Sequence, residues 1–468
     1  MHYHSLSLYI QLRRFRRRLK SKEKKKVRNK KKIKALEQDK ELRIQGKTAK
    51  SFADVFNLFM PSHLRYIISV KDSPLYYEKF ERLKYKKELE IAIPKEFSII
   101  DNPDVAYACL RKIASAIFYQ SCSSLWLDYS NCESCDLATQ VYLDSILIDN
   151  DRFIRHCTRA KVDRYLRISS VGGRNINNIK LQQMINSVGS PVELINRRIR
   201  FTNIIPYRLR HIDGSASTAQ LRKGQKELDT TDLIQYVLDC LSRFNRSLSQ
   251  KARQDLGNVV GEIISNAEEH STLHNRYLIG YMDESRKSDT HYGILNLVMM
   301  NTGGTIYEKF KYPSDDVEFN TECLNQMRTL SDKFKKKSFF RPNAFTEENL
   351  WTLYTLQGGV SSIPPSIRKR GNGTIEFIDS FFKLKGSNDV DDVSCMSIIS
   401  GNTQIDFDGT YRIKKVPDSD GHLVGVMSFN DSGNLEEKPN SKYVYHIKNY
   451  FPGTIICAKL LINEDELL

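Results

Sequence analysis

The chain has 468 residues, enough for about three domains of ~150 residues each, and its 40% hydrophobic and 10% aromatic content excludes a wholly disordered protein. No run reaches the ~18 uninterrupted apolar residues of a membrane-spanning helix, and residues 5–12 lack the preceding basic residues of a secretory signal. The net charge of +16 is concentrated in residues 13–34, which contain 15 Lys/Arg and one Glu, so the rest of the chain carries only +2.

The first 87 residues contain a basic tail and a connecting region. Residues 1–50 are expected to be a helical or disordered tail, and residues 51–87 a connecting helical region that includes the apolar stretch FADVFNLFM. A block of like charge such as 13–34 could bind nucleic acid, an anionic membrane or an acidic partner. A solvated helix without any partner is the alternative.

Residues 88–212 alternate between strand-like and helix-like patterns. The expected order is strand, helix, strand, helix, strand and helix, at 88–94, 104–120, 123–130, 136–149, 165–173 and 175–189. This alternation predicts an α/β layer with parallel strands, and it resembles a STAS-like domain, a small regulatory fold often joined to ATPase or phosphorelay modules. The polar residues 213–230, rich in Gly, Ser and Thr, are expected to form a linker.

The nine cysteines are scattered and odd in number, which indicates a reducing compartment such as the cytoplasm. Cys132 and Cys135 form one Cys-x-x-Cys pair, but no second pair lies at the spacing of a zinc site. Ordinary packing is therefore favoured over a metal or redox site.

Residues 231–468 are expected to form a second, larger domain. Two helices are predicted between 231 and 270, and strands follow at 276–283, 292–300, 393–400, 403–413 and 453–462. Helices that precede and interrupt antiparallel strands predict an α/β sandwich with a mixed, mainly antiparallel sheet. The fold class of the whole chain is thus α/β (α+β).

The second of the two helices carries polar residues beside its apolar stripe. In the stretch GEIISNAEEHS, Glu262 and Asn266 are one helical turn apart and project to the same place. The Asn266 side chain offers a neutral oxygen suited to Mg²⁺, and the Glu262 carboxylate could polarise an attacking water. A capping or interhelical polar cluster is the alternative.

Three further motifs follow in order along the chain. Asn301, Gly303 and Gly304 end a strand in a glycine turn, where the backbone could approach a ligand closely and Asn301 could accept a hydrogen bond from an adenine amino group. A second glycine motif precedes a predicted helix and contains Gly371, Asn372, Gly373 and Thr374. Backbone N–H groups at such a helix start are suited to binding phosphates. Arg370 precedes the motif and either faces phosphate or lies in a solvated loop. Thr454 follows a glycine at the start of the last strand.

These four motifs, in this order, resemble the Bergerat-fold ATP-binding domain of the GHKL group, which includes gyrase-type ATPases, Hsp90-type chaperones and histidine kinases. The resemblance covers roughly residues 231–465 and implies ATP and Mg²⁺ as cofactors. It implies that Glu262 is the catalytic base and that Asn266 holds the metal. Two departures concern the first glycine box, where Asn301 replaces the usual Asp and Thr305 replaces the second glycine.

The expected function is an ATP-operated switch that slowly hydrolyses ATP and couples nucleotide state to a protein partner of the N-terminal α/β domain. Bacterial regulation or phage defence is the setting that the resemblance suggests, and a homodimer is left open. Autokinase activity is disfavoured because no histidine lies on the helices between 231 and 261. The alternatives are a nucleic-acid-binding adaptor that acts through 13–34 with a degenerate ATPase domain, and a serine/threonine kinase like the anti-sigma factors.

Overall fold

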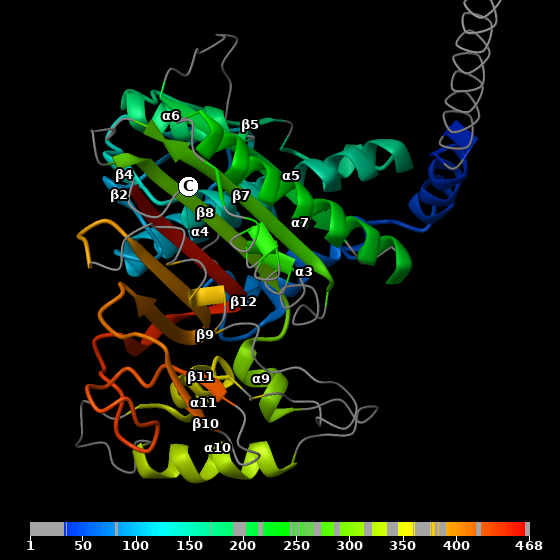
Figure 1. Cartoon of the computed structure of the whole chain (residues 1–468). Coiled ribbons are helices and arrows are strands. Elements are labelled where there is room, and N and C mark those ends of the chain that lie inside the picture. The colour runs from blue at the N-terminus through cyan, green and yellow to red at the C-terminus, as the bar shows by residue number, and fades with distance from the viewer. Residues whose placement is uncertain are drawn as a thin grey trace, which may run out of the picture. The chain divides into compact units, whose positions relative to one another are not determined.

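The computed structural model is an α+β protein in which most paired strands are antiparallel, as the sequence predicted (Figure 1). It divides into two compact units: unit 1 is Met1–Pro61 with Asn150–Ser169, and unit 2 is Ser62–Asp149 with Ser170–Leu468. Within the residues described below, no helix combines the length and the apolar character needed to cross a membrane. The structure describes residues 32–33, 35–79, 83–168, 170–190, 203–213, 219–243, 247–248, 250, 253–254, 256–257, 260–261, 264, 273–284, 291–312, 321–334, 345–358, 360, 375, 377–379, 382, 390–417 and 423–463.

A five-stranded antiparallel sheet is the centre of unit 2. Its strands lie in the order β6-β7-β8-β12-β9. Their bounds are β6 Ile204–Asp213, β7 Asn275–Asp283, β8 His291–Thr302, β12 Val444–Asn463 and β9 Cys395–Phe407. The strands predicted at 276–283, 292–300 and 453–462 are confirmed as β7, β8 and part of β12. Most described side chains of β7 and β8 are buried, as expected of strands that are covered on both faces.

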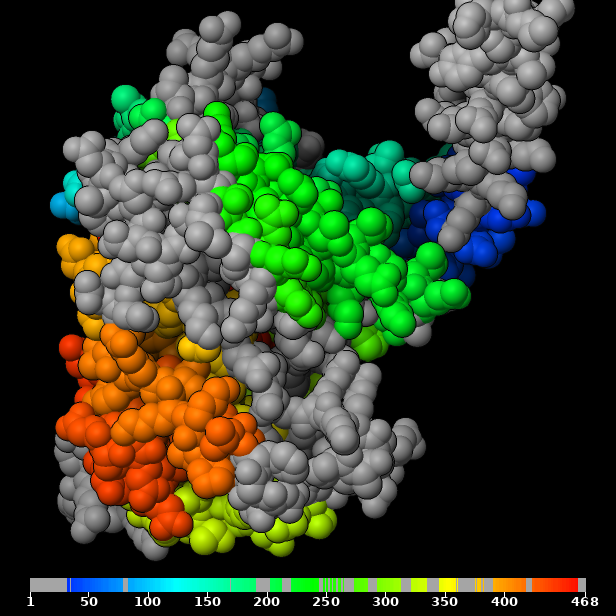
Figure 2. All heavy atoms as spheres, in the orientation of Figure 1, coloured from blue at the N-terminus to red at the C-terminus, as the bar shows by residue number. Residues whose placement is uncertain are grey.

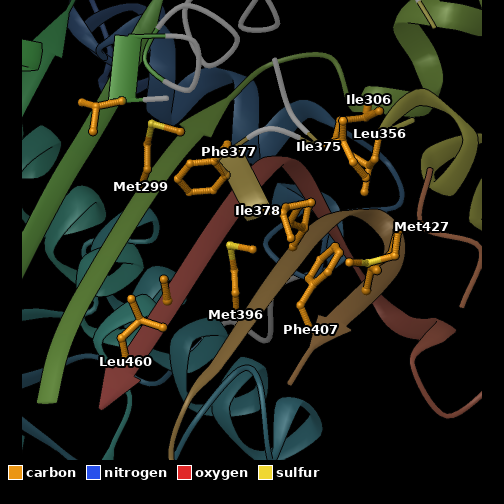
Figure 3. Packing of buried hydrophobic residues seen from close by; sticks show 14 of the residues in the cluster. Met299, Ile306, Leu356, Ile375, Phe377, Ile378, Met396, Phe407, Met427 and Leu460 are labelled. Carbon is orange, nitrogen blue, oxygen red and sulfur yellow. The ribbon is translucent and has the colours of Figure 1, made fainter. Parts of the chain in front are cut away.

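One face of this sheet packs against the helix α7 (Ala219–Ser242), which lies in front of the strands in Figure 1 and at the surface in Figure 2. Leu278, Met299 and Met396 of the sheet belong to the same buried cluster as Val237 of α7. Figure 3 shows Met299, Met396 and Leu460 with Phe377 in this core. We call this face the α7 face of the sheet.

The opposite face of the sheet packs against helices from the N-terminal part of unit 2. The Tyr277 ring on β7 lies 5.4 Å from the His63 ring on α3 (Ser62–Ser69). Phe451 on β12 meets Tyr142 on α5 (Leu137–Ala160) edge to face, with ring centroids 5.2 Å apart. The helix α4 (Pro103–Phe118) also contacts β12.

A three-stranded parallel sheet lies in the same unit. Its order is β1-β3-β5, with β1 Lys86–Ala92, β3 Cys122–Asp128 and β5 Ser170–Arg174. The helices α4 and α5 connect these strands in sequence, so the predicted alternation of strands and helices is confirmed. A short parallel pair, β2 (Glu96–Phe97) with β4 (Ser134–Cys135), lies beside it, and α6 (Ile179–Val188) follows β5.

The rest of unit 2 is built on segments between and after the strands of the large sheet. In the described residues this part contains three helices and an antiparallel hairpin: α9 Ile306–Lys311, α10 Thr321–Phe334, α11 Glu347–Thr355, and β10 Lys414–Pro417 with β11 Leu423–Val426. A short 3₁₀ helix, η1 Tyr77–Lys79, lies earlier in the chain. Trp351 of α11 is fully buried, and its indole N–H donates to Ser331 Oγ of α10.

Unit 1 is small and mainly helical. Residues 35–46 are helical, and α2 (Phe52–Phe59) begins with a capping box formed by Ser51 and Asp54. The last residues of α5 lead into η2 (Asp163–Tyr165). Phe56 of α2 packs edge to face on Phe153 of α5 at 6.2 Å. The helical tail and the helix in the connecting region are confirmed for these residues, while the part of the tail before residue 32 lies outside the described residues.

Three elements differ from the sequence prediction. The helix α7 begins at Ala219, so most of the segment 213–230 that was predicted as a linker is helical. The strand β6 falls within 88–212 but pairs with β7 of the large sheet. The two strands predicted at 393–400 and 403–413 are the single strand β9 as far as Phe407. The division into domains at 88–212 and 231–468 stays a prediction, because both segments contribute to unit 2.

Candidate functional site

The end of β8 and the middle of β12 bring two of the predicted site residues together. Asn301 on β8 lies directly opposite Thr454 on β12 in the antiparallel register. The Asn301 side-chain oxygen accepts the backbone N–H of Thr454 at 2.9 Å, and both residues are buried. Two motifs 153 residues apart in the sequence therefore form one polar contact.

Glycines allow the backbone to bend next to this contact. Gly303 has a φ of 138°, and its N–H donates to the carbonyl of Pro452 at 3.2 Å. Gly453 has a φ of 150°, and a Cβ on it would lie 2.2 Å from the Asn301 carbonyl oxygen. Any larger residue at 453 would push β12 away from β8, so the glycine before Thr454 is required for the pairing.

Ser400 on β9 completes the polar cluster, and the sequence prediction missed it. Its hydroxyl donates to the Gly453 carbonyl and accepts the N–H of Ile306, both at 3.0 Å. It also lies 3.0 Å from the Thr454 hydroxyl. Because a serine hydroxyl has only one proton, Thr454 is the donor in that pair. The only signal in the sequence was a serine that follows the apolar residues Ile398 and Ile399.

Thr305, which stands where the resemblance expects a second glycine, has a structural role. It is the N-cap of α9, where its hydroxyl accepts the Glu308 N–H at 3.1 Å and the Glu308 carboxylate accepts the Thr305 N–H at 2.8 Å. This capping box satisfies N–H groups at the start of the helix. The departure at 305 therefore fixes the direction in which the chain leaves the glycine turn.

A small apolar cavity lies on the α7 face of the sheet, the face that carries Asn301 and Thr454. Its volume is about 50 Å³. Its walls are Leu233 and Val237 of α7, Leu256, Val260 and Ile264 of the following helical segment, Leu278, Leu297, Val298, Met299, Ile456 and Ala458 of the sheet, and Phe377. We call these residues the apolar floor. Ligand pockets are typically ~300–1,000 Å³, so this cavity by itself is too small to hold a nucleotide.

The described residues of the segment 250–264 include part of the apolar helical stripe that the sequence predicted to be buried. Leu256, Val260 and Ile264 are helical, lie four residues apart and are all buried against the cavity. Phe377, which follows the second glycine motif, is also helical and buried there. Seven of the predicted site residues lie outside the described residues: Glu262, Asn266, Arg370, Gly371, Asn372, Gly373 and Thr374.

An acidic side chain lies close to the polar cluster. Glu348 of α11 accepts the N–H of Asn402 at 2.8 Å, two residues beyond Ser400. Burial raises the pKa of Glu348 to about 7. Within the described part of the chain, no group of three His, Cys, Asp or Glu side chains could hold a metal ion, and the predicted Mg²⁺ ligand Asn266 lies outside that part.

Comparison with known proteins gives one weak similarity. No protein-family model matches the chain, and no solved structure matches it. The chain is 23% identical over 170 residues to a Phytophthora infestans (strain T30-4) protein described as an RxLR effector protein, a match that covers 36% of this chain and 94% of that protein. At this identity the similarity assigns no family, so function is argued from the site.

Proposed function

We propose that the protein binds ATP with Mg²⁺ where the end of β8 pairs with the middle of β12, and that it acts as a nucleotide-operated switch. The main support is the contact between Asn301 and Thr454 on the sheet face that carries the apolar floor. This arrangement puts the first glycine motif and the closing Gly-Thr motif side by side. Leu256, Val260 and Ile264, from the segment that also contains the Glu-Asn motif in the sequence, line the same face of the sheet.

The chemistry of these residues suits a purine base. A base buries a flat apolar surface and needs a few fixed polar groups at its edge. The apolar floor supplies the first, and the buried Asn301 amide and Thr454 hydroxyl supply the second. The Asn301 oxygen accepts the Thr454 N–H, which fixes the orientation of the amide beside the proposed base.

The remaining roles belong to residues that the structure does not describe. Asn266 would hold Mg²⁺, the glycine loop 371–374 and Arg370 would bind the phosphates, and Glu262 would orient and deprotonate an attacking water. When bound, the metal neutralises phosphate charge. The role of Glu262 decides between three fates of ATP, which are hydrolysis, transfer of its phosphate and binding alone.

The sheet carries the proposed nucleotide site on one face and contacts N-terminal helices on the other, so it could couple the nucleotide to a partner. Asn301 and Thr302 are neighbours on β8, and Thr302 is held by Asn275 of β7 through a side-chain bond to its N–H at 3.1 Å. Tyr277, two residues further along β7, contacts His63 of α3 on the face away from α7. A nucleotide that moves the end of β8 would therefore move the N-terminal helices, which we propose to be the partner-binding part.

None of the nine cysteines is in a disulfide, which suits the reducing compartment, such as the cytoplasm, that we propose. The setting in bacterial regulation or phage defence stays an expectation of the resemblance.

ATP binding and turnover by wild type, Asn266→Ala and Glu262→Ala test the proposal. Asn266→Ala should lose Mg²⁺-dependent binding, and Glu262→Ala should bind ATP but not release phosphate. Asn325→Ala and Glu322→Ala on the exposed side of α10 are the matched controls and should behave like wild type. Normal binding and turnover by both site variants would show that the site assignment is wrong. Transfer of labelled phosphate only to another protein would show that the protein is a kinase.

A further inference from the structure

The net positive charge of the chain is concentrated in unit 1. Unit 1 contains 25 Lys/Arg and 7 Asp/Glu, a net charge of +18, while unit 2 contains 47 and 49, a net charge of −2. Residues 13–34 supply most of this charge, but residues 150–169 add six Lys/Arg against two Asp. The basic character therefore belongs to a compact unit that includes chain from two distant parts of the sequence.

The described part of unit 1 carries five exposed cations close together in the sequence. They are Arg155, Arg159, Lys161, Arg164 and Arg167, at the end of α5 and through η2. We call these five residues the arginine surface. Arg155 pairs with Asp151 at 2.5 Å and Arg159 with Asp39 at 3.8 Å. Such exposed ion pairs contribute little stability, so a phosphate can compete for these guanidinium groups.

The helix that follows the basic segment is fixed to the arginine surface. A Cβ on Gly46 would lie 2.5 Å from the Ala160 carbonyl oxygen, so the end of the N-terminal helix packs closely against the end of α5. The Tyr165 hydroxyl donates to the Ala49 carbonyl at 3.5 Å, and the Asp39–Arg159 pair joins the same two helices. The described part of the N-terminal helix therefore lies beside the arginine surface.

We infer that unit 1 is a nucleic-acid-binding module that contacts phosphates through the arginine surface. Four of the five cations are arginines, whose planar guanidinium groups form two parallel hydrogen bonds to a phosphate. Arg164 lies 5.1 Å from the ring centroid of the half-buried Tyr165, which adds an aromatic group to the patch. This inference does not depend on the ATP site.

An anionic membrane is the competing partner for the same charges. Ile33, Leu36 and Ile44 are exposed apolar side chains on the N-terminal helix, and a membrane would bury them. In contrast, none of the large apolar residues that the structure describes between 150 and 168 is exposed. The arginine surface thus offers hydrogen-bond donors without an apolar group to insert, which favours a phosphodiester backbone.

The test measures binding of the full-length protein to a fluorescein-labelled 20-base-pair DNA duplex as a function of salt. The slope of log K against log salt should be about −0.9 for each phosphate contacted. Replacing Arg155, Arg159, Arg164 and Arg167 by Gln should weaken binding at least tenfold and make the slope shallower. The matched control, Gln at the exposed unit 2 residues Lys180, Arg328, Lys415 and Lys448, should change binding less than twofold.

Two further variants separate binding from stability and from membrane attachment. Lysine at the four arginine positions keeps the charge, so most of the salt slope should remain if the protein is folded. The inference is overturned if the glutamine variant binds DNA like the control. It is also overturned if the wild type binds phosphatidylserine vesicles but not DNA, and loses the vesicles when Ile33, Leu36 and Ile44 become Ser.

Discussion

Asp144 is a carboxylic acid in the interior of unit 2, and its environment favours the neutral form. One of its oxygens accepts Gln140 Nε2 at 2.8 Å and the Ser190 hydroxyl at 2.7 Å. The other, Oδ2, is buried and has no hydrogen-bond partner among the described residues. Burial raises the pKa of Asp144 to about 7.

This pKa predicts that stability falls as pH rises. The unfolded carboxyl has a pKa of about 4, so between roughly pH 4 and 7 the folded state holds a proton that the unfolded state has lost. The contribution is fully present below about pH 4 and is lost as pH rises through 7. Asp144→Asn should match wild type at pH 4 and be more stable at pH 8, by up to about 4 kcal/mol.

Urea unfolding at the two pH values measures this difference. Asp431→Asn, at an exposed loop acid, is the control and should follow wild type at both. The pKa of Glu348 is also raised by burial, so some slope should persist in the Asp144 variant. An Asp144 variant that is no more stable than wild type at pH 8 would mean that the buried carboxyl is stabilised in its charged form.

Residues of the site differ in how well the sequence predicted them. Asn301 and Thr454 were found because each follows or precedes a glycine at the end of an apolar strand, and the structure brings them together. Ser400 was missed because its partners Gly453 and Ile306 are more than 50 residues away in the sequence. A buried serine inside an apolar strand gives no local sign of such contacts.

At the scale of elements, α7 depends on polar contacts inside the fold. Asp229 of α7 and Arg276 of β7 form an ion pair at 2.5 Å with both side chains almost completely buried. Gln225 Nε2, one turn earlier, donates to the other oxygen of Asp229 at 2.9 Å. Removing one partner of a buried pair leaves an uncompensated charge, which costs far more than removing both.

Asp229→Ala should therefore lower the free energy of unfolding by about 3–5 kcal/mol, measured by chemical denaturation. The double variant Asp229→Leu with Arg276→Met should lose much less. The control is on the same helix: Asp232 pairs with Arg210 at 3.0 Å with both side chains half exposed, so Asp232→Ala should cost under about 1 kcal/mol. Equal losses for Asp229→Ala and Asp232→Ala would contradict the buried-pair explanation.

The same contacts explain where the element prediction failed. Residues 219–230 have a polar composition typical of linkers, yet they are helical, with Asp229 fixed to Arg276 of β7. The strand β9 continues past Gly401, which has a φ of 59°, with a register shift against β12. A glycine there predicted a strand break, and the structure contains an irregularity within one strand. Apolar periodicity predicted β7 and β8 well because it does not depend on distant partners.

At the scale of the whole molecule, the two units have separate proposed roles. Unit 2 contains the proposed ATP site, and unit 1 contains all of the net positive charge. The sequence indicated the basic tail, but it could not indicate that residues 150–169 join that tail, because no local pattern encodes a contact such as Gly46 against Ala160.

The most direct test of the central claim is the affinity of Asn301→Ala for Mg-ATP, measured by isothermal titration calorimetry beside wild type and Asn275→Ala. The two asparagines are matched, since both are buried at strand ends and each accepts a backbone N–H, from Thr454 and Thr302 respectively. The account predicts saturable binding by wild type, binding at least tenfold weaker by Asn301→Ala, and near-normal binding by Asn275→Ala. No binding by wild type at millimolar Mg-ATP, or equal losses in the two variants, would contradict it.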